Sequence, residues 1–231
     1  MPERFAIYYA PPATGALWEK ASTWLGWDAA TEERFDGSLA GIERARLLNL
    51  TESAVRYGFH ATIKAPMALV DGATEADLRA ALTAFAEQHA PVEVGPMQLT
   101  LLGGFLAIIP AQQSDAVQDF AAHVVENFDV FRAPMSVKDR AARVAKGLTE
   151  RQEELLDAYG YPYVFEQFQM HMTLTDRLEE ADREPITAAA RTWFGPLAEE
   201  PLTIDSISLF HEADRGRPFR RIADFPLRGQ A

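Results

Sequence analysis

Two short segments of the chain carry residues that can move protons and hold a phosphate. Residues 59–63 read Phe-His-Ala-Thr-Ile, and residues 170–174 read Met-His-Met-Thr-Leu. Alternate residues of a β-strand share one face of the strand. We therefore expect His60 and Thr62 to share a face in the first segment, and His171 and Thr173 to share a face in the second, each backed by apolar residues on the core side.

These residue types suit the cleavage of a phosphodiester. In-line displacement at phosphorus needs a base on the attacking oxygen and an acid on the leaving oxygen. Histidine titrates near neutrality and can take either part, and a threonine hydroxyl can donate to a phosphoryl oxygen. A single His-x-Thr is most often a packed strand histidine. Two copies in the same apolar register predict one shared site, provided that two halves of the chain face each other.

With both motifs present, the chain resembles the two-histidine (2H) phosphoesterase superfamily, whose members carry paired His-x-Thr/Ser-x motifs with x mostly apolar. The likeness extends to a bacterial subfamily associated with phosphonate-utilisation operons, and it spans essentially the whole chain. It is carried by residues 56–66, 131–134, 160–164 and 168–174. The resemblance implies an α+β class and a bilobed, duplicated fold with antiparallel sheets around a central cleft.

The resemblance also implies an activity and a role for each motif residue. Members open or form cyclic phosphodiesters, or process 2′-5′ linkages in RNA, without a metal or other cofactor. By motif position, His60 and His171 would be the acid–base pair, and Thr62 and Thr173 would hold the phosphate. Because the motif is symmetric, the sequence leaves open which histidine is the base.

Residues near the motifs are candidates for binding substrate. Lys64 continues the His60 face by alternation and would be either a phosphate clamp or a solvated strand-end lysine. Tyr161 and Tyr163 would either stack on a base or border a sugar, or pack as an aromatic turn. Arg132 could reach a second phosphate of the substrate. The candidates are Arg56, Tyr57, Lys64, Arg132, Tyr161 and Tyr163.

Basic residues gather in two further places. Residues 132–151 contain six basic and two acidic residues, and we interpret Arg140, Arg143 and Lys146 as part of a solvated helical face. A second basic island lies near the C-terminus, and one or two of its members could line the cleft. It contains Arg215, Arg217, Arg220 and Arg221.

The overall composition limits the partners. The 231 residues include 22 basic and 34 acidic ones, a formal net charge of −12, and no cysteine. This charge disfavours long nucleic acids, and the resemblance implies a small phosphorylated partner with a cyclic phosphodiester; a short RNA end stays open, and no DNA or membrane partner is expected. The absence of cysteine excludes thiolate chemistry, and no metal-ligating or triphosphate-binding motif occurs. No signal peptide or membrane span is recognised, which predicts a cytoplasmic location.

Three functions remain open at this point. The first is a metal-independent phosphodiesterase that opens a small cyclic phosphosugar or nucleotide. The second is an enzyme that processes RNA ends. The third is a binding module that keeps the cleft without turnover.

Periodicity and turn residues predict the elements that position the motifs. Thr74 with Asp77, and Thr149 with Gln152, have the spacing of capping boxes. We expect one bilobed domain over residues 1–231, with 59–63 in the first lobe and 170–174 in the second. The predicted strands are 4–10, 58–66, 97–102, 105–109, 165–175, 202–210 and 219–227, and the predicted helices cover 17–25, 74–85, 117–128, 149–159 and 185–194.

Overall fold

A seven-stranded antiparallel sheet is the central element of the computed structural model, which describes residues 3–230. Its strand order is β4-β5-β6-β2-β1-β8-β9, and β3 pairs separately with β7. The predicted α+β class with antiparallel sheets is confirmed. The strands are β1 (Arg4–Tyr9), β2 (Ala61–Met67), β3 (Val92–Gly95), β4 (Met97–Leu102), β5 (Phe105–Pro110), β6 (Met172–Arg177), β7 (Leu202–Ile204), β8 (Ser206–Glu212) and β9 (Arg220–Pro226).

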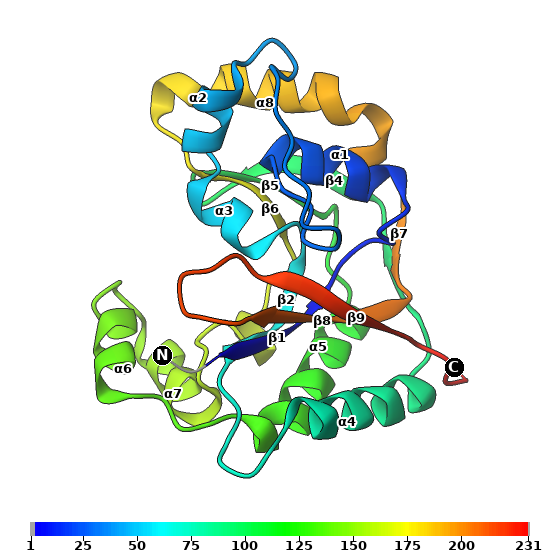
Figure 1. Cartoon of the computed structure of the whole chain (residues 1–231), viewed down its shortest axis with the longest axis vertical. Coiled ribbons are helices and arrows are strands. Elements are labelled where there is room, and N and C mark those ends of the chain that lie inside the picture. Colours follow the sequence, from blue (N-terminus) through cyan, green and yellow to red (C-terminus); the bar gives the residue numbers. More distant parts are fainter. Residues whose placement is uncertain (1–2, 231) are drawn as a thin grey trace.

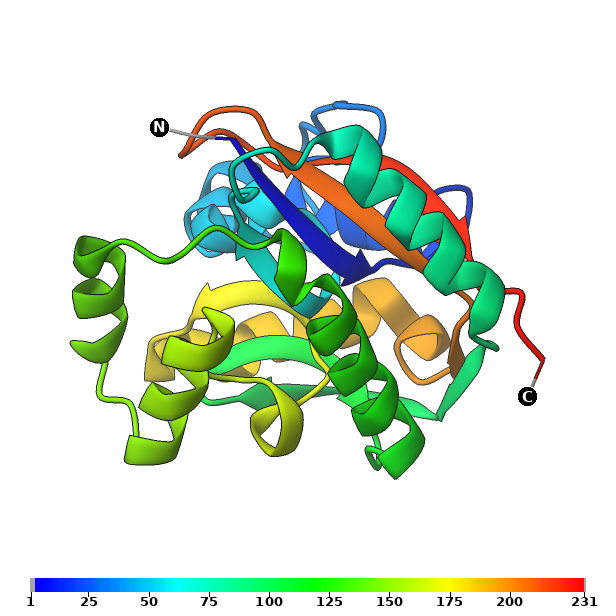
Figure 2. The same ribbon diagram turned by 90° about the horizontal axis from the view of Figure 1, so that it is seen from below.

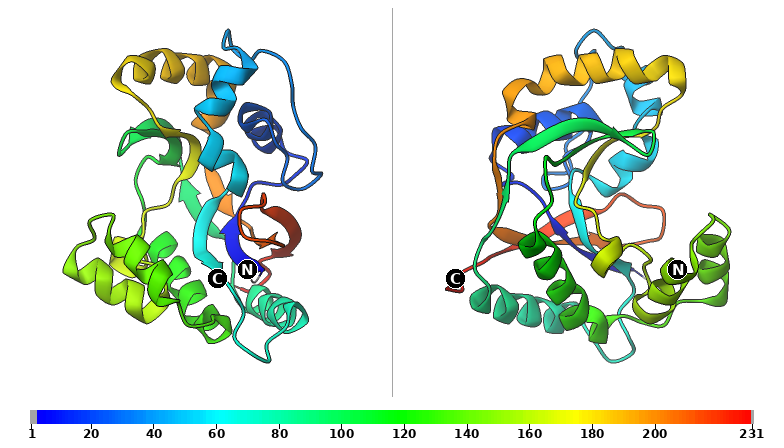
Figure 3. Two further views of the ribbon diagram at one scale, coloured as in Figure 1. Left: turned by 60° about the vertical axis from the view of Figure 1, so that its left-hand side comes forward. Right: turned by 180° about the vertical axis from the view of Figure 1, so that it is seen from behind.

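The helices cover the two halves of this sheet separately. In Figure 1, α1, α2, α3 and α8 gather beside the β4–β6 half, and α4 and α5 lie against the other half. Figures 2 and 3 show α6 and α7 standing together at one side of the molecule. The helices are α1 (Ala16–Leu25), α2 (Arg44–Asn49), α3 (Glu52–Tyr57), α4 (Glu75–Gln88), α5 (Asp115–Phe128), α6 (Val137–Val144), α7 (Glu150–Tyr159) and α8 (Glu180–Phe194), with 3₁₀ turns at Asp129–Phe131, Phe165–Gln167 and Gly195–Ala198.

Local sequence signals account for several element boundaries. Both predicted capping boxes are confirmed: Thr74 caps α4 with Asp77, and Thr149 caps α7 with Gln152. The β4–β5 hairpin turns at Gly103-Gly104, where both residues have positive φ, a conformation that glycine adopts without the steric cost of a side chain.

Other boundaries differ from the predictions. The expected strand at 165–175 is wrong in its first half, because Phe165 has a positive φ and opens a 3₁₀ turn; β6 begins only at Met172. The last predicted helix begins earlier than expected, at Glu180, so Pro185 lies inside it. The predicted strand 202–210 is split at Asp205 into β7 and β8. Short elements α2, α3, β3 and α6 had no clear periodicity in the sequence.

The two motif strands are neighbours in the middle of the sheet. Strand β2 pairs with β6 at Ala61 and Met172, which are both buried. Apolar residues that flank the motif positions, such as Phe59 before the first motif and Leu174 after the second, belong to the same hydrophobic core. The core therefore fixes the backbone on which the histidines and threonines are carried. No helix within residues 3–230 is long and apolar enough to cross a membrane.

Candidate active site

The β2–β6 pairing brings the two motifs together. Ala61 lies opposite Met172 in an antiparallel register. Continuing that register by one residue in each direction places His60 opposite Thr173 and Thr62 opposite His171. Directly opposed residues have Cβ atoms roughly 5 Å apart, and diagonal neighbours lie roughly 7–8 Å apart. Each histidine thus faces the threonine of the other motif, and the two histidines are diagonal neighbours on the face opposite Ala61 and Met172.

Both histidines are anchored in the same way. His60 and His171 each lie one residue before their strand begins, and each places Nδ1 against the carbonyl oxygen two residues earlier. The distances are 2.9 Å from His60 Nδ1 to Gly58 O and 2.7 Å from His171 Nδ1 to Gln169 O. Because a carbonyl only accepts, Nδ1 carries the proton in each neutral ring, and Nε2 keeps its lone pair for chemistry.

The surroundings of His60 keep it neutral. Its ring stacks on Tyr8 with centroids 3.8 Å apart, and the Thr62 hydroxyl lies 3.1 Å from Nε2 and donates to it. Burial lowers the pKa of His60 from 6.5 to about 4, the Gly58 carbonyl opposes that shift, and nearby His171 adds to it. Tyr8 itself is buried, which raises the pKa of its hydroxyl well above the usual value. His60 is therefore uncharged at neutral pH.

His171 has a different environment. Its ring lies 5.7 Å from that of Phe105, and burial lowers its pKa as well, opposed by the Gln169 carbonyl. A cleft of about 990 Å³ opens in front of the motifs; His60, Thr62 and Thr173 line it, and His171 is not among its lining residues. The four predicted motif residues are thus brought together on one face, with unequal access to the cleft.

Two predicted binding residues have their charged groups bound by the protein itself. The β1–β2 register skips one residue of β2 between Thr62 and Lys64, so the alternation changes phase at this bulge. Lys64 is 3 % exposed, and its Nζ donates to Val125 O at 3.1 Å and to Asp129 Oδ1 at 2.9 Å. Arg132 touches the cleft, but its guanidinium is bound by both Asp129 oxygens and by Ala158 O. Lys64 is not a solvated strand-end lysine either.

Arg56 and Tyr57 line the cleft beside His60. Arg56 lies 5.3 Å from the Tyr57 ring centre and bonds the buried carboxylate of Glu212. Burial acts to raise the pKa of Glu212, but hydrogen bonds from Arg56, the Gly216 amide and Arg4 hold it below its ordinary value. Glu212 is consequently charged, and it positions Arg56 at the cleft wall.

The two predicted tyrosines separate. Tyr161 lines the cleft, and burial raises its pKa to about 12. Tyr163 is 45 % exposed and lies outside the cleft lining, with its ring edge-on to Tyr161 at 5.5 Å. Only Tyr161 is therefore placed to meet a ligand in this cleft. Tyr8 was missed by the sequence analysis, since a tyrosine in a buried first strand carries no signal of its own.

Within the expected solvated helical face, no residue of α6 is buried and Lys146 is exposed, but its basic residues do not all face the same way. Arg143 and Lys146 line the cleft together with Lys138, whereas Arg140 points elsewhere and pairs with Asp157 and Glu153. Of the C-terminal basic island, Arg215 lines the cleft. Arg220 pairs with Glu32, and Arg221 is buried against Asp224. The position of Arg143 on the cleft side of α6 had no local signal, because the helix has no buried residue that would fix its orientation, and Lys146 lies beyond its end.

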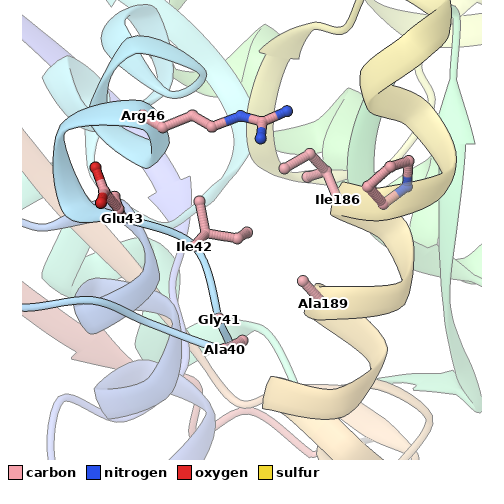
Figure 4. A pocket seen from close by; sticks show the side chains of 8 residues that line it. Ala40, Gly41, Ile42, Glu43, Arg46, Ile186 and Ala189 are labelled. Atoms are coloured by element: carbon pink, nitrogen blue, oxygen red, sulfur yellow. The ribbon is translucent and has the colours of Figure 1, made fainter.

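Two further features of the described chain bear on function. Within residues 3–230, no group of three or more His, Cys, Asp or Glu side chains is arranged to hold a metal ion. A smaller hollow of about 420 Å³ lies between residues 40–43 and α8 (Figure 4). Its lining is mainly apolar, with Glu43 and Arg46 at one side. Of these two hollows, the larger one is lined by His60, Thr62 and Thr173.

Comparison with known proteins gives a family and curated relatives. The family described as "Protein of unknown function (DUF1045)" matches residues 62–220, which begins two residues after His60. The chain is 35% identical over 232 residues to "Ribose 1,5-bisphosphate phosphokinase PhnN" of Janthinobacterium sp. (strain Marseille), covering 98% of this chain and 51% of that protein. The protein of the same name from Laribacter hongkongensis (strain HLHK9) is 35% identical over 217 residues, covering 94% and 50%. The chain spans about half the length of these relatives.

Solved structures of lower similarity also match along the whole chain. Apo LigT of E. coli is 15% identical with a TM-score of 0.46, covering 99% of both chains. TT0787 of Thermus thermophilus is 16% identical with a TM-score of 0.45, covering 99% of this chain and 100% of that one.

Proposed function

The chain belongs to the DUF1045 family. From its paired motifs we propose that it is a phosphodiesterase that opens a small cyclic phosphodiester, with two histidines as the acid and the base. One observation supports this proposal: Ala61 of β2 pairs with Met172 of β6, and continuing this register by one residue each way would set each histidine opposite the threonine of the other motif. The resemblance to the two-histidine phosphoesterases rests on the same residues and supports the same chemistry.

The proposed reaction is an in-line hydrolysis. His60 Nε2 takes a proton from water as its oxygen bonds to phosphorus. The ring P–O bond breaks, and its electron pair stays on the leaving oxygen, which receives a proton from His171 Nε2. The Thr62 hydroxyl gives up its bond to His60 Nε2 when substrate binds, and the Thr62 and Thr173 hydroxyls then donate to the non-bridging oxygens, where negative charge grows. The product is a phosphate monoester with a free hydroxyl.

The assignment of base and acid follows from electrostatics. Burial holds the pKa of His60 at about 4, so His60 is neutral at pH 7 and has a lone pair on Nε2. Burial also lowers the pKa of His171, but a bound phosphate anion favours the protonated imidazolium and raises the pKa of a nearby histidine. His171 would then carry the proton that the leaving oxygen needs.

The substrate class is a phosphorylated sugar or nucleotide. The cleft of about 990 Å³ has the size of a small-molecule site. The name of the curated relatives, ribose 1,5-bisphosphate phosphokinase, supports a ribose phosphate over other sugars. The likeness to a subfamily of phosphonate-utilisation operons supports the same choice. We propose that this chain opens the cyclic phosphate ring of a ribose phosphate by the reaction above and so supplies its phosphate monoester in phosphonate breakdown.

Hydrolysis assays test the proposal directly. Ribose cyclic phosphates and 2′,3′-cyclic nucleotides are incubated with the protein in the presence of EDTA, and release of the monoester is followed. We expect turnover by the wild type and a loss of about 10²–10⁴-fold in kcat for His60→Ala and for His171→Ala. His123→Ala is the matched control, because His123 is exposed on α5.

Two results would contradict this function. Equal turnover by the wild type and either motif variant would show that the paired histidines are not the catalysts. Tight binding of a cyclic phosphate with no product after hours would instead identify a binding module.

A further inference from the structure

One face of α6 forms a wall of the cleft, apart from the motif strands. On α6, Ala142 and Arg143 follow Asp139 at the three- and four-residue spacings that share a helix face, and Lys146 lies in the turn just after the helix; all four residues line the cleft. Lys138 lines it from the edge of this face. We call Lys138, Arg143 and Lys146 the α6 cation group.

The α6 cation group is the part of the cleft whose positive charge is least neutralised by the protein. Seven basic and two acidic residues line the cleft in a chain with a net charge of −12. Arg4 and Arg56 share Glu212, Arg132 is paired with Asp129, and Arg215 with Asp139. In contrast, none of the α6 cation group forms an ion pair with a described residue. Its one recorded aromatic contact is Arg143, 5.7 Å from the centre of Tyr161.

A series of tyrosine rings leads from the histidines to the α6 cation group. His60 stacks on Tyr8 and lies 6.2 Å from the ring of Tyr57. Tyr57 and Tyr161 are close enough to raise the pKa of Tyr8 electrostatically, after the larger effect of burial. Arg143 then lies over Tyr161. A ligand whose phosphodiester is between the histidines would pass over these rings, which suit a sugar face, before it reaches α6.

We propose, on the basis of the function proposed above, that the α6 cation group binds a second phosphate, so that the substrate carries a phosphate monoester in addition to the cyclic diester. Lysine and arginine side chains without a protein counter-charge are well suited to a phosphate dianion. Arg132 was the candidate for this role by sequence, but its donors are used by Asp129 and Ala158. Substrates without the second phosphate are then bound weakly.

Calorimetric titration with two stable ligands tests the second-phosphate site. Ribose 1,5-bisphosphate and ribose 5-phosphate differ by one phosphate, and neither contains a bond that the proposed reaction cleaves. We expect the wild type to bind the bisphosphate at least tenfold more tightly. Arg143→Gln/Lys146→Gln should reduce this ratio to less than threefold. Arg140→Gln/Arg151→Gln removes the same charge from residues that pair with surface carboxylates, and should keep the ratio.

Each remaining outcome decides the matter. No measurable binding of the bisphosphate, equal affinity for both ligands, or an equal loss of the ratio in the control would overturn the second-phosphate site. Thermal unfolding of each variant verifies that it is folded. A protein that shows the ratio but hydrolyses no cyclic phosphate would overturn the proposed function and leave the second-phosphate site standing.

Discussion

Gly58 determines how His60 is presented. It has φ +72°, which disfavours any other residue, and a Cβ on it would lie 2.8 Å from the Cβ of Ala29. Its carbonyl also receives the Nδ1 proton of His60. We expect Gly58→Ala to lower the free energy of unfolding by about 2–4 kcal/mol and kcat by at least tenfold, because both strain and clash move this carbonyl.

Gly72→Ala is the matched control for that substitution. Gly72 has φ +89° and open space where a Cβ would lie, so its substitution adds strain without a clash. Urea denaturation should show a loss of about 1 kcal/mol for Gly72→Ala, with unchanged kcat. Equal stability losses in the two variants would refute the contact with Ala29 as a cause.

The lowered pKa of His60 makes stability depend on pH. In the unfolded chain His60 binds a proton below pH 6.5, whereas in the folded protein it does so only below about 4. Between these values the unfolded state binds more protons, so His60 destabilises the fold progressively as the pH falls from 6.5 to 4. Urea denaturation at pH 7 and pH 4 should show an acid loss about 2–3 kcal/mol larger in the wild type than in His60→Gln. Parallel losses in the two proteins would argue against the burial of His60 as the cause.

Residue patterns alone could identify the motif residues but not every candidate around them. The alternation of apolar and polar residues, repeated in two segments, is visible in the sequence itself. It was enough to single out His60, Thr62, His171 and Thr173. Lys64 was misplaced because a bulge in β2 reverses the alternation, and bulges depend on the partner strand.

At the scale of elements, Lys64 joins β2 to the end of α5. Its buried ammonium is bound by Asp129, which also holds Arg132, and burial lowers the pKa of Lys64 against the opposing effect of that carboxylate. Asp129→Asn leaves this buried cation without a counter-charge. We expect it to reduce the free energy of unfolding by about 2–4 kcal/mol, the lower end reflecting the partial exposure of Asp129.

Lys64→Met separates this structural role from phosphate binding. This substitution removes the buried charge together with its need for a partner, so it should reduce the free energy of unfolding by less than Asp129→Asn does. The double variant should lose less stability than the sum of the two single losses. Because Lys64 lies outside the cleft, KM should stay within twofold of wild type. A tenfold increase in KM would restore the phosphate-clamp role.

The side that α6 presents to the cleft could not be predicted from its own sequence. The helix has no buried residue, so no apolar stripe fixes its orientation. Its direction is instead set by packing on α7 and by the Asp139–Arg215 ion pair, whose partner lies 76 positions away. Long-range contacts of this kind leave no local pattern in the chain.

For the whole molecule, the net charge of −12 and the basic cleft lining have opposite effects on ligands of different length. A small phosphate ester meets only the cleft, while a long RNA also meets the acidic exterior. We expect affinity for RNA with a terminal cyclic phosphate to stop increasing beyond a few nucleotides, and salt to weaken it modestly. Filter binding of 3-, 10- and 30-nucleotide RNAs measures this. Affinity that grows steadily with length would favour RNA-end processing.

The single Ala61–Met172 pairing has a consequence for how this gene can vary. All four motif side chains lie on one face because β2 and β6 pair in one register. A one-residue slip of that register would turn a strand's side chains to the opposite face. Insertions or deletions of one codon within β2 or β6 should therefore abolish function even where every motif residue is retained. The same changes in the turn at residues 71–73 should be neutral. A codon-indel library under selection would record the register as two narrow intolerant windows 111 positions apart.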